Sequence, residues 1–403
     1  MKVRIEPSVL KGSITAPPSK SYAHRMLICG ALSDGTSTIK GISESEDMNA
    51  TLDCIKALGA ETVREGDKVH IGVIKRTDDN TPFFSCRESG STLRFMIPVA
   101  LAFYDHAVFE GSKRLIERGI GVYEEVFAHK GITVNKSTES IEINGRLVPG
   151  EYRVRGDVSS QYITGLMMAL PLLDADSVIH ITGHAESRPY IHITMDVLRL
   201  FGIDIEEINE NEYHIRGRKR FADTSVRAEG DWSNAAFLYA LKYLGNDIDI
   251  KGLNGSSRQG DRACLSIFEA LDSGNLKVDL SDCPDLGPVM FAYAALKSGG
   301  VFTGTRRLRI KESDRVLCMQ EELSKFGIKT EITENTFTVI KGELKRPKAE
   351  LSSHNDHRIA MALSVIASVT GGTIDGSEAV RKSYPDFYDV MRKLGMEVFD
   401  ETT

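Results

Sequence analysis

The sequence has little that marks a membrane, secreted or metal-binding protein. Its six cysteines form no CxxC pair, which argues against a zinc site or a disulfide framework and predicts buried free thiols. No uncharged apolar run approaches the roughly 20 residues that span a bilayer, and the first residues, MKVRIEPSVL, contain no apolar core of a signal peptide. We therefore expect a soluble, cytoplasmic protein without a membrane partner.

Motifs for nucleotides, metals and nucleic acids are missing as well. The sequence contains neither a GxxxxGKS/T loop nor a GxGxxG loop after a strand, and no His, Cys and Asp cluster has the spacing of metal ligands. The net charge of −7 argues against a general nucleic-acid partner. We expect no metal and no cofactor, and any anion site must come from a local concentration of Lys and Arg.

Six copies of one unit account for most of the 403 residues. Each copy opens with a short alternating apolar run that ends at a glycine, then passes through a polar loop into an amphipathic helix and period-2 strands. The glycines stand 70, 72, 69, 52 and 72 residues apart, at positions 41, 111, 183, 252, 304 and 376. The short fourth interval leaves little room for the final hairpin of that copy.

A second kind of helix precedes each of these strands. Six segments are apolar nearly all round, which is typical of a helix buried inside a domain: SKSYAHRMLICGAL, ESGSTLRFMIPVALAF, VSSQYITGLMMALPLL, GDWSNAAFLYALKYL, PDLGPVMFAYAALKS and NDHRIAMALSVIASV. The unit is therefore βαβαββ, and six units divide into two α/β domains of three. We predict one continuous domain over 19–228 and a second over 1–18 plus 229–403, which holds the shortened fourth unit and recruits the N-terminal strand.

Each buried helix begins with a polar cluster, and several of these clusters carry cations. Free N–H groups and the helix dipole make a helix N-terminus a ready binding place for anions. These ends contribute Lys20, Ser21, Arg25, Gly90, Ser91, Ser159, Ser160, Gln161, Asp285 and Arg358. The loops after the repeat glycines add Arg118, Ser187, Tyr190, Lys311, Glu312, Arg315 and Lys382.

Each of these residues has an ordinary structural explanation when it is considered alone. A Lys or Arg at a helix start is usually solvated, a Ser there usually caps the helix, and a first-turn carboxylate usually stabilises the dipole. Recurrence in equivalent places of the repeats favours a site, because capping does not require cations where the dipole disfavours them. The pattern predicts an inter-domain site for a ligand with phosphate or carboxylate groups.

Seven motifs follow one another along the chain: PSKSYAHR, ESGSTLRF, SSQY, ESRPYI, KESDR, NDHRIAM and RKSYPDF. Together they resemble the motifs of the 5-enolpyruvylshikimate-3-phosphate synthase family, over essentially the whole chain. The resemblance implies a two-domain inverted α/β barrel with three βαβαββ units in each domain. It also implies transfer of the enolpyruvyl group of phosphoenolpyruvate to the 5-hydroxyl of shikimate 3-phosphate, with release of phosphate. We expect a monomer.

The resemblance further implies roles for the polar residues. Shikimate 3-phosphate would be held by Ser21, Arg25, Ser159, Ser160, Gln161, Ser187 and Lys311, with Tyr190 stacking nearby. Phosphoenolpyruvate would be held by Lys20, Gly90, Arg118, Gln161, Arg315, Arg358 and Lys382. Asp285 would act as the base toward the 5-hydroxyl, and Glu312 and Lys20 as proton donors and acceptors, in a site that domain closure shields from water.

Three residues depart from the family pattern. Glu88 stands where many members carry asparagine, Phe95 replaces a common proline, and Arg307 falls where an asparagine contact to shikimate 3-phosphate is expected. Gly90 leaves room for phosphonate analogues of phosphoenolpyruvate, so we expect inhibition by glyphosate.

Two other functions stay open. A UDP-N-acetylglucosamine enolpyruvyl transferase would share the fold and the transferred group, but that family uses a cysteine in the loop after the second repeat strand. The corresponding loop here, EGSKRLIERGIG, has none. A non-catalytic binder of phosphorylated metabolites would need the cations but neither Asp285 nor Glu312.

Overall fold

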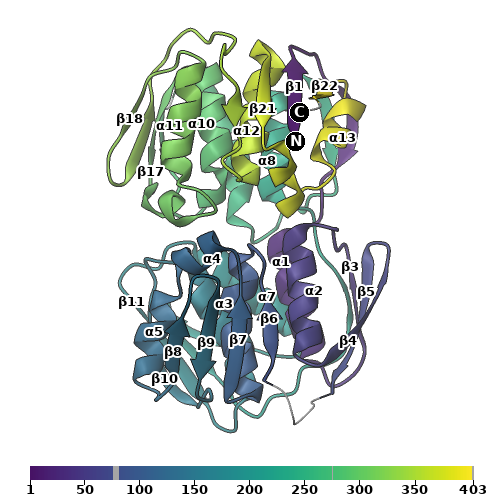
Figure 1. Cartoon of the computed structure of the whole chain (residues 1–403), viewed down its shortest axis with the longest axis vertical. Coiled ribbons are helices and arrows are strands. Elements are labelled where there is room, and N and C mark those ends of the chain that lie inside the picture. Colours follow the sequence, from purple (N-terminus) through teal and green to yellow (C-terminus); the bar gives the residue numbers. More distant parts are fainter. Residues whose placement is uncertain (76–80, 275, 402–403) are drawn as a thin grey trace. The chain divides into compact units, whose positions relative to one another are not determined.

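The computed structural model describes residues 1–75, 81–274 and 276–401. The chain divides into two units. One is Pro18–Glu229, the continuous unit, and the other is Met1–Pro17 together with Gly230–Thr403, the discontinuous unit. Each unit combines sheets and helices drawn from repeated segments of the chain (Figure 1).

The helices of the continuous unit are α1 (Lys20–Ala31), α2 (Glu46–Ala57), α3 (Gly90–Phe103), α4 (Lys113–Arg118), α5 (Gly121–Ala128), α6 (Ser160–Ala169) and α7 (Arg188–Leu200), with a 3-10 turn at Leu170–Leu172. Its strands are β3 (Ser37–Lys40), β4 (Ala60–Glu65), β5 (Lys68–Ile74), β6 (Phe83–Ser85), β7 (His106–Glu110), β8 (Thr133–Lys136), β9 (Ser140–Asn144), β10 (Gly150–Arg155), β11 (Ser177–Thr182), β12 (Glu206–Asn209), β13 (Glu212–Ile215) and β14 (Ser225–Arg227).

Three sheets of the continuous unit share one topology. Their strand orders are β14-β3-β5-β4, β6-β7-β9-β8 and β10-β11-β13-β12. In each sheet the first two strands are parallel and the remaining pairs are antiparallel. Two parallel strands need a crossover connection, which a buried helix supplies in the second and third sheets. The consecutive antiparallel strands β4 and β5, β8 and β9, and β12 and β13 need only a hairpin. The βαβαββ unit inferred from the repeats is therefore confirmed.

The helices of the discontinuous unit are α8 (Trp232–Tyr243), α9 (Cys264–Asp272), α10 (Gly287–Leu296), α11 (Arg315–Lys325), α12 (His357–Thr370) and α13 (Phe387–Lys393), with 3-10 turns at Gly260–Ala263, Pro284–Leu286, Arg306–Ile310 and Ser377–Lys382. Its strands are β1 (Lys2–Glu6), β2 (Lys11–Thr15), β15 (Asp247–Lys251), β16 (Lys277–Asp279), β17 (Gly300–Thr303), β18 (Thr330–Ile332), β19 (Thr336–Val339), β20 (Leu351–Ser352), β21 (Gly372–Asp375) and β22 (Glu397–Glu401).

Strands from the N-terminus complete two sheets of the discontinuous unit. The sheet β16-β17-β19-β18 repeats the topology of the continuous unit, and β20-β21-β1-β22 does so with β1 in the third place. Figure 1 shows the purple β1 beside the yellow β22. The remaining strand, β2, pairs in parallel with β15 in a two-stranded sheet. That fourth repeat has no antiparallel hairpin among the described residues, so it is shorter than the others.

The apolar helices expected from the sequence form the interior. Tyr22–Ala31 of α1 and Gly287–Ala295 of α10 are buried without interruption, and α3, α6, α8 and α12 are buried along most of their length. Each unit has its own hydrophobic core. Since these helices are covered on all sides, only their ends can present polar groups to a ligand.

Close packing of α3 on α6 depends on Gly165. Tyr123 donates its hydroxyl hydrogen bond to the Arg94 carbonyl at 2.7 Å, beside this glycine. A Cβ atom at Gly165 would lie 2.5 Å from the same carbonyl oxygen and closer still to the Tyr123 hydroxyl. The absence of a side chain at Gly165 therefore permits the approach of the two helices.

We predict that Gly165→Ala lowers the free energy of unfolding by about 3 kcal/mol, because the methyl group forces buried backbone apart. Gly121→Ala is the matched control, since its Cβ would meet only Glu124 Oε2, at 4.0 Å. The control should change stability by less than about 0.5 kcal/mol. Urea unfolding of both variants measures the difference, and equal stabilities would contradict this account of the packing.

Candidate functional site

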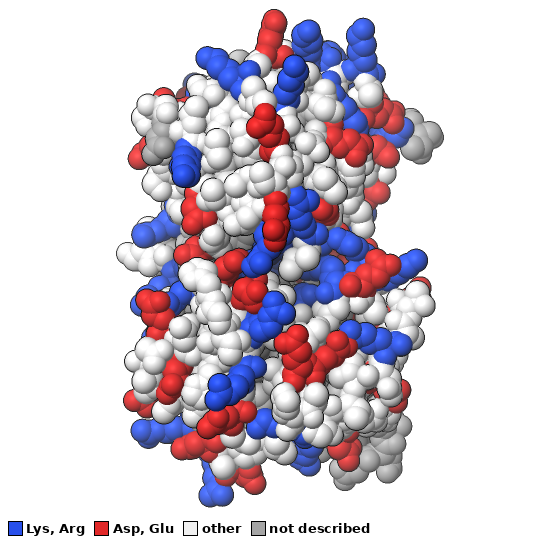
Figure 2. Space-filling model, turned by 90° about the vertical axis from the view of Figure 1, so that its left-hand side faces the viewer, with Lys and Arg blue, Asp and Glu red and all other residues white. Residues whose placement is uncertain are grey.

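Charges of both signs are interspersed over the surface that Figure 2 presents, as expected from the net charge of −7. The overall field therefore does not select for anions. Anion binding has to come from clusters in which cations are held in a fixed geometry. Both units contain such clusters, and the predicted residues fall into them.

In the continuous unit, Arg25 is the centre of the first cluster. Its side chain is 3% exposed, and it lies where α1, α6 and α7 meet. Arg25 donates hydrogen bonds to Thr194 Oγ1 at 2.8 Å, the Ser21 carbonyl at 2.7 Å, the Tyr190 carbonyl at 3.1 Å and Thr164 Oγ1 at 3.2 Å. All four acceptors are neutral, so the guanidinium is oriented without losing its net charge.

The second cluster surrounds the N-terminus of α3. Gln161 joins α6 to α3 by accepting a hydrogen bond from Arg94 Nη1 and donating one to Ser91 Oγ, both at 2.9 Å. A Cβ atom at Gly90 would lie 2.8 Å from Arg94 Nη1 and 2.9 Å from Arg118 Nη2. Two guanidinium groups therefore lie directly against Gly90, beside free N–H groups of the helix end.

The other predicted residues of this unit lie at helix starts or beside them. Lys20 Nζ makes an ion pair with Asp47 Oδ2 at 2.7 Å, with both side chains mostly buried. Ser159 caps α6 by accepting from the Gln161 N–H, and Ser160 is buried in the first turn. Ser187 precedes α7 with a φ of 57°, a left-handed backbone that non-glycine residues adopt mainly at constrained sites.

In the discontinuous unit, Arg315 binds three carboxylates. This 1% exposed guanidinium contacts Asp285 Oδ1 at 2.9 Å, Glu312 Oε2 at 2.8 Å and Asp356 Oδ2 at 2.8 Å. Burial opposes the charge, but these three carboxylates raise the pKa of Arg315 above its ordinary value. Burial also acts against the charge of Asp356, yet Arg315 lowers the pKa of that carboxyl. Arg315 therefore fixes the positions of the two predicted proton carriers, Asp285 and Glu312.

Three further cations complete this network. Arg358 Nη2 contacts Asp285 Oδ2 at 3.1 Å, and Lys311 Nζ contacts Asp285 Oδ1 at 3.4 Å. Lys382 donates to the Asn355 carbonyl at 2.6 Å. Every predicted site residue of the discontinuous unit thus lies in one connected region.

Burial lowers the pKa of two of these cations. It lowers the pKa of Lys311 to about 8 and that of Arg25 to about 10. Arg25 remains charged at neutral pH. With a pKa of about 8, Lys311 stays mainly protonated at neutral pH but gives up its proton more readily than an ordinary lysine.

A buried carboxylate supports the loop before α12. Glu322 is fully buried on α11 and accepts hydrogen bonds from Lys325 at 2.8 Å, His354 at 2.8 Å and the Ser352 N–H at 3.0 Å. Glu321, Glu322 and His354 also have the spacing of metal ligands. The Lys325 ammonium already lies against both carboxylates of that group, at 2.8 and 3.7 Å.

The His354–Glu322 hydrogen bond supports a strained loop that carries residues of the site. His354 and Asn355 both have left-handed backbones, with φ of 50° and 54°. The next residue, Asp356, caps α12 through the Arg358 N–H and binds Arg315. Because two consecutive left-handed residues are costly, the His354–Glu322 contact stabilises the conformation that presents Asp356 and the Asn355 carbonyl.

The three residues that depart from the family pattern differ in their burial and their contacts. Phe95 is buried, lies edge-on to the His24 ring, and has the Arg25 guanidinium 5.0 Å from its ring centroid, within cation–π range. Its replacement of proline therefore adds a contact to the first cluster. Arg307 is 5% exposed and lies in the 3-10 turn Arg306–Ile310, whereas Glu88 is half-buried just before α3.

Sequence reasoning missed several contributors. Asp47, the partner of Lys20, was not assigned a role, and neither were Thr164 and Thr194, which orient Arg25. The sequence did contain a signal for Asp47. It follows the repeat glycine Gly41 in the segment that leads into the amphipathic helix, and the corresponding segment of the fifth repeat carries Glu312. The two threonines had none, because their role depends on the packing of α6 and α7 against α1.

All six cysteines are buried free thiols, as predicted, and the Cys54 and Cys86 sulfurs are 4.0 Å apart. Within the described part of the chain, no helix has the length and apolar character needed to cross a bilayer.

Comparisons with known proteins find relatives over the full length of the chain. A family model described as EPSP synthase (3-phosphoshikimate 1-carboxyvinyltransferase) matches residues 5–391. A Clostridium kluyveri protein named 3-phosphoshikimate 1-carboxyvinyltransferase is 38% identical over 420 aligned positions, which cover 98% of each chain. A Clostridium acetobutylicum protein of the same name is 39% identical over 421 positions, which cover 99% of this chain and 98% of the relative.

Solved structures share the fold at lower sequence identity. EPSP synthase from Acinetobacter baumannii superposes with a TM-score of 0.79 at 22% identity, covering 99% of this chain and 100% of that one. The enolpyruvyl transferase NikO from Streptomyces tendae gives a TM-score of 0.76 at 16% identity, covering 100% of this chain and 99% of that one. At these identities the similarity establishes the two-domain α/β architecture.

The His354–Glu322 contact predicts a pH dependence of stability. The Cys318 sulfur and the Glu322 carboxylate raise the pKa of His354 to about 10, above its ordinary value of 6.5. A raised pKa stabilises the fold fully below pH 6.5, and this stabilisation is lost as the pH rises through about 10. The stability gap between wild type and His354→Gln should therefore be widest below pH 6.5 and narrow toward pH 10.

Thermal unfolding across this pH range measures the gap, and His129→Gln, at an exposed histidine, is the control. A gap that stays constant with pH would contradict the assignment of a charged His354.

Proposed function

The chain belongs to the EPSP synthase (3-phosphoshikimate 1-carboxyvinyltransferase) family, and on that premise we propose that it catalyses the reaction of that name. The enolpyruvyl group of phosphoenolpyruvate moves to the 5-hydroxyl of shikimate 3-phosphate, and inorganic phosphate leaves. Both substrates are small polyanions. We propose that the protein acts as a monomer on these small molecules, without a cofactor, nucleic-acid or membrane partner.

The observation that carries this proposal is the network around Arg315. A site that only bound anions would gain nothing from carboxylates close to its cations. Here Asp285 and Glu312 are both held by one buried guanidinium, at 2.9 and 2.8 Å, with Lys311 and Arg358 against Asp285. Acids beside cations suit a reaction that moves protons on an anionic substrate.

The reaction is an addition followed by an elimination. Protonation of the methylene carbon of phosphoenolpyruvate makes its C2 electrophilic, and the 5-hydroxyl oxygen forms a bond to C2 while losing its proton. The tetrahedral intermediate then loses phosphate and one methyl proton, which restores the enol ether. We assign Asp285 as the base toward the 5-hydroxyl, and Glu312 and Lys20 as the groups that donate and accept the proton on carbon.

The remaining predicted residues hold the two anions. We assign phosphoenolpyruvate to Lys20, Gly90, Arg118, Gln161, Arg315, Arg358 and Lys382, and shikimate 3-phosphate to Ser21, Arg25, Ser159, Ser160, Gln161, Ser187, Tyr190 and Lys311. Ser91 is assigned to substrate binding without a choice between the two. The geometry of Arg25 supports this assignment, because its four protein partners are neutral and leave its charge uncompensated. A pre-oriented cation binds a phosphate at a low cost in conformational entropy.

The experiment that tests the function measures phosphate release from phosphoenolpyruvate with alternative acceptors. Release only with shikimate 3-phosphate is the expected result. Release with UDP-N-acetylglucosamine instead would favour that enolpyruvyl transferase. Binding of the anions without any release would favour a non-catalytic binder.

In the same assay, Asp285→Asn should lower kcat by about a hundredfold or more, because it removes the proposed base. Asp282→Asn, at an exposed carboxylate three positions away, is the matched control and should leave kcat unchanged. Thermal unfolding of both variants separates loss of catalysis from loss of fold, and equal kcat values would contradict the role of Asp285.

Glyphosate inhibition tests the surroundings of Gly90. We expect Gly90→Ala to weaken inhibition at least about tenfold, because the methyl group would displace the guanidinium groups of Arg94 and Arg118. The measurement is the inhibition constant against phosphoenolpyruvate, with Gly121→Ala as the control. Unchanged inhibition in Gly90→Ala would show that the inhibitor does not bind beside this glycine.

A further inference from the structure

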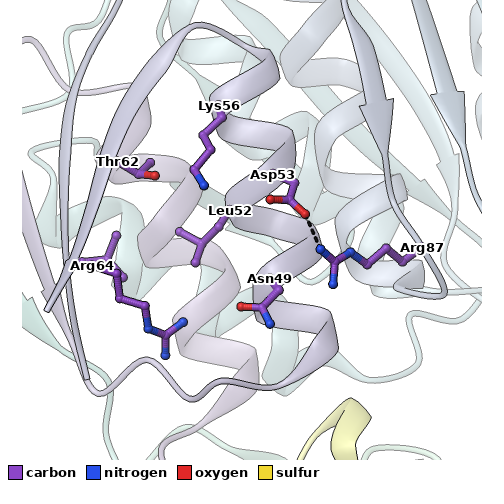
Figure 3. Close-up of a pocket in the computed structure, with 8 residues that line it drawn as sticks. Asn49, Leu52, Asp53, Lys56, Thr62, Arg64 and Arg87 are labelled. Atoms are coloured by element: carbon purple, nitrogen blue, oxygen red, sulfur yellow. Dashed lines mark hydrogen bonds and ion pairs between the residues drawn. The ribbon is translucent and has the colours of Figure 1, made fainter. Parts of the chain in front are cut away.

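A pocket that the proposed reaction does not use lies in the continuous unit. Its volume is about 270 Å³, and it is bounded by α2, β4, β5 and Arg87 (Figure 3). Leu52 and Val69 line it with apolar surface and are themselves 7% and 0% exposed. This size suits a small organic molecule rather than a polymer.

One wall of the pocket carries a rigid cation. Arg64 on β4 donates from Nε to the Gly66 carbonyl at 3.1 Å and from Nη2 to the Ile42 carbonyl at 2.8 Å. These bonds fix the guanidinium plane, and Nη1 has no hydrogen-bond acceptor among the residues that the structure describes. A ligand would therefore meet a donor whose side-chain entropy has already been lost.

Two more cations lie near the same space. Lys56, in the last turn of α2, makes no ion pair within the described ranges. Arg87 reaches α2 from the opposite side and contacts Asp53 Oδ2 at 2.5 Å (Figure 3). Its backbone has a left-handed φ of 51°. Asp53 is the one acidic residue among those that line the pocket, and it is already paired.

We propose that this pocket binds a small organic carboxylate. The carboxylate would be held by Arg64 and Lys56 and would compete with Asp53 for Arg87, while the apolar body of the ligand rests on Leu52, with the buried Val69 directly behind it. Guanidinium groups favour this ligand, since their planar donors match a carboxylate. Arg64 Nε also lies 3.8 Å from Oε1 of the exposed Glu44, so a ligand would compete with this weak, solvent-screened ion pair. Lys56 is the one cation of the lining for which the described residues provide no carboxylate partner.

None of the residues that line the pocket is assigned to the reaction. A bound ligand could still affect the reaction site, because Arg87 is close in sequence to Gly90. Arg87 stands three residues before Gly90, at the start of the turn that leads into α3. Release of Arg87 from Asp53 would loosen the contact that ties this turn to α2. A carboxylate bound here would be a further ligand at a site distinct from that of the proposed reaction.

The test uses benzoate and acetate as probes on the full-length protein. Methyl-labelled leucine and valine report locally, so a titration followed by NMR should shift the Leu52 and Val69 methyl signals until they saturate. Benzoate should bind more tightly than acetate, because only benzoate can cover the apolar lining. Absence of a saturable shift at these two residues would overturn the proposal.

Charge variants distinguish this site from general attraction of anions. Lys56→Gln should weaken benzoate binding about two- to fivefold, and Asp53→Asn should tighten it by a similar factor because Arg87 is released. The matched control is Lys68→Gln, which removes the same charge from β5 next to Val69 but outside the pocket lining. Equal weakening by Lys56→Gln and Lys68→Gln, or no tightening in Asp53→Asn, would overturn the proposal.

Discussion

Helices that are apolar around their whole circumference must be covered on every side, and the rest of this structure follows from that constraint. In the continuous unit α1, α3 and α6 occupy the interior, so the sheets and the amphipathic helices have to lie around them. The same arrangement recurs in the discontinuous unit around α8, α10 and α12. Since the sides of such helices are closed to solvent, chemistry can only be placed at their ends.

Charges at those ends are buried, and the two units compensate this burial in different ways. Arg25 is surrounded by hydroxyl and carbonyl oxygens, which orient it but leave its charge available to an anion. Arg315 instead contacts three carboxylates and fixes their positions. A buried charge is costly unless it is paired or hydrogen-bonded. The first arrangement therefore suits a group that only binds substrate, and the second suits a group that also positions acids and bases.

How much could be predicted depended on the range of the interactions involved. Periodicity, the spaced glycines and the apolar helices predicted six βαβαββ units, and the sheets repeat that topology with one shortened copy. The residues around Asp285 were also predicted, because motifs such as KESDR and NDHRIAM carry them. The partners of those residues were not predictable in the same way. Thr164 lies 139 positions from Arg25, and only the packing of α6 beside α1 brings them within 3.2 Å.

By itself, the sequence determined the repeat, the buried helices, the family and the polar residues at the helix ends, because local periodicity and short motifs encode these properties. The tertiary structure alone decided which cation meets which acceptor. It directs Arg25 to neutral oxygens and Arg315 to carboxylates, and it brings Arg64, Lys56 and Arg87 around one pocket. The physical reason is that these contacts join elements distant in sequence, whose relative positions depend on the packing of the whole core.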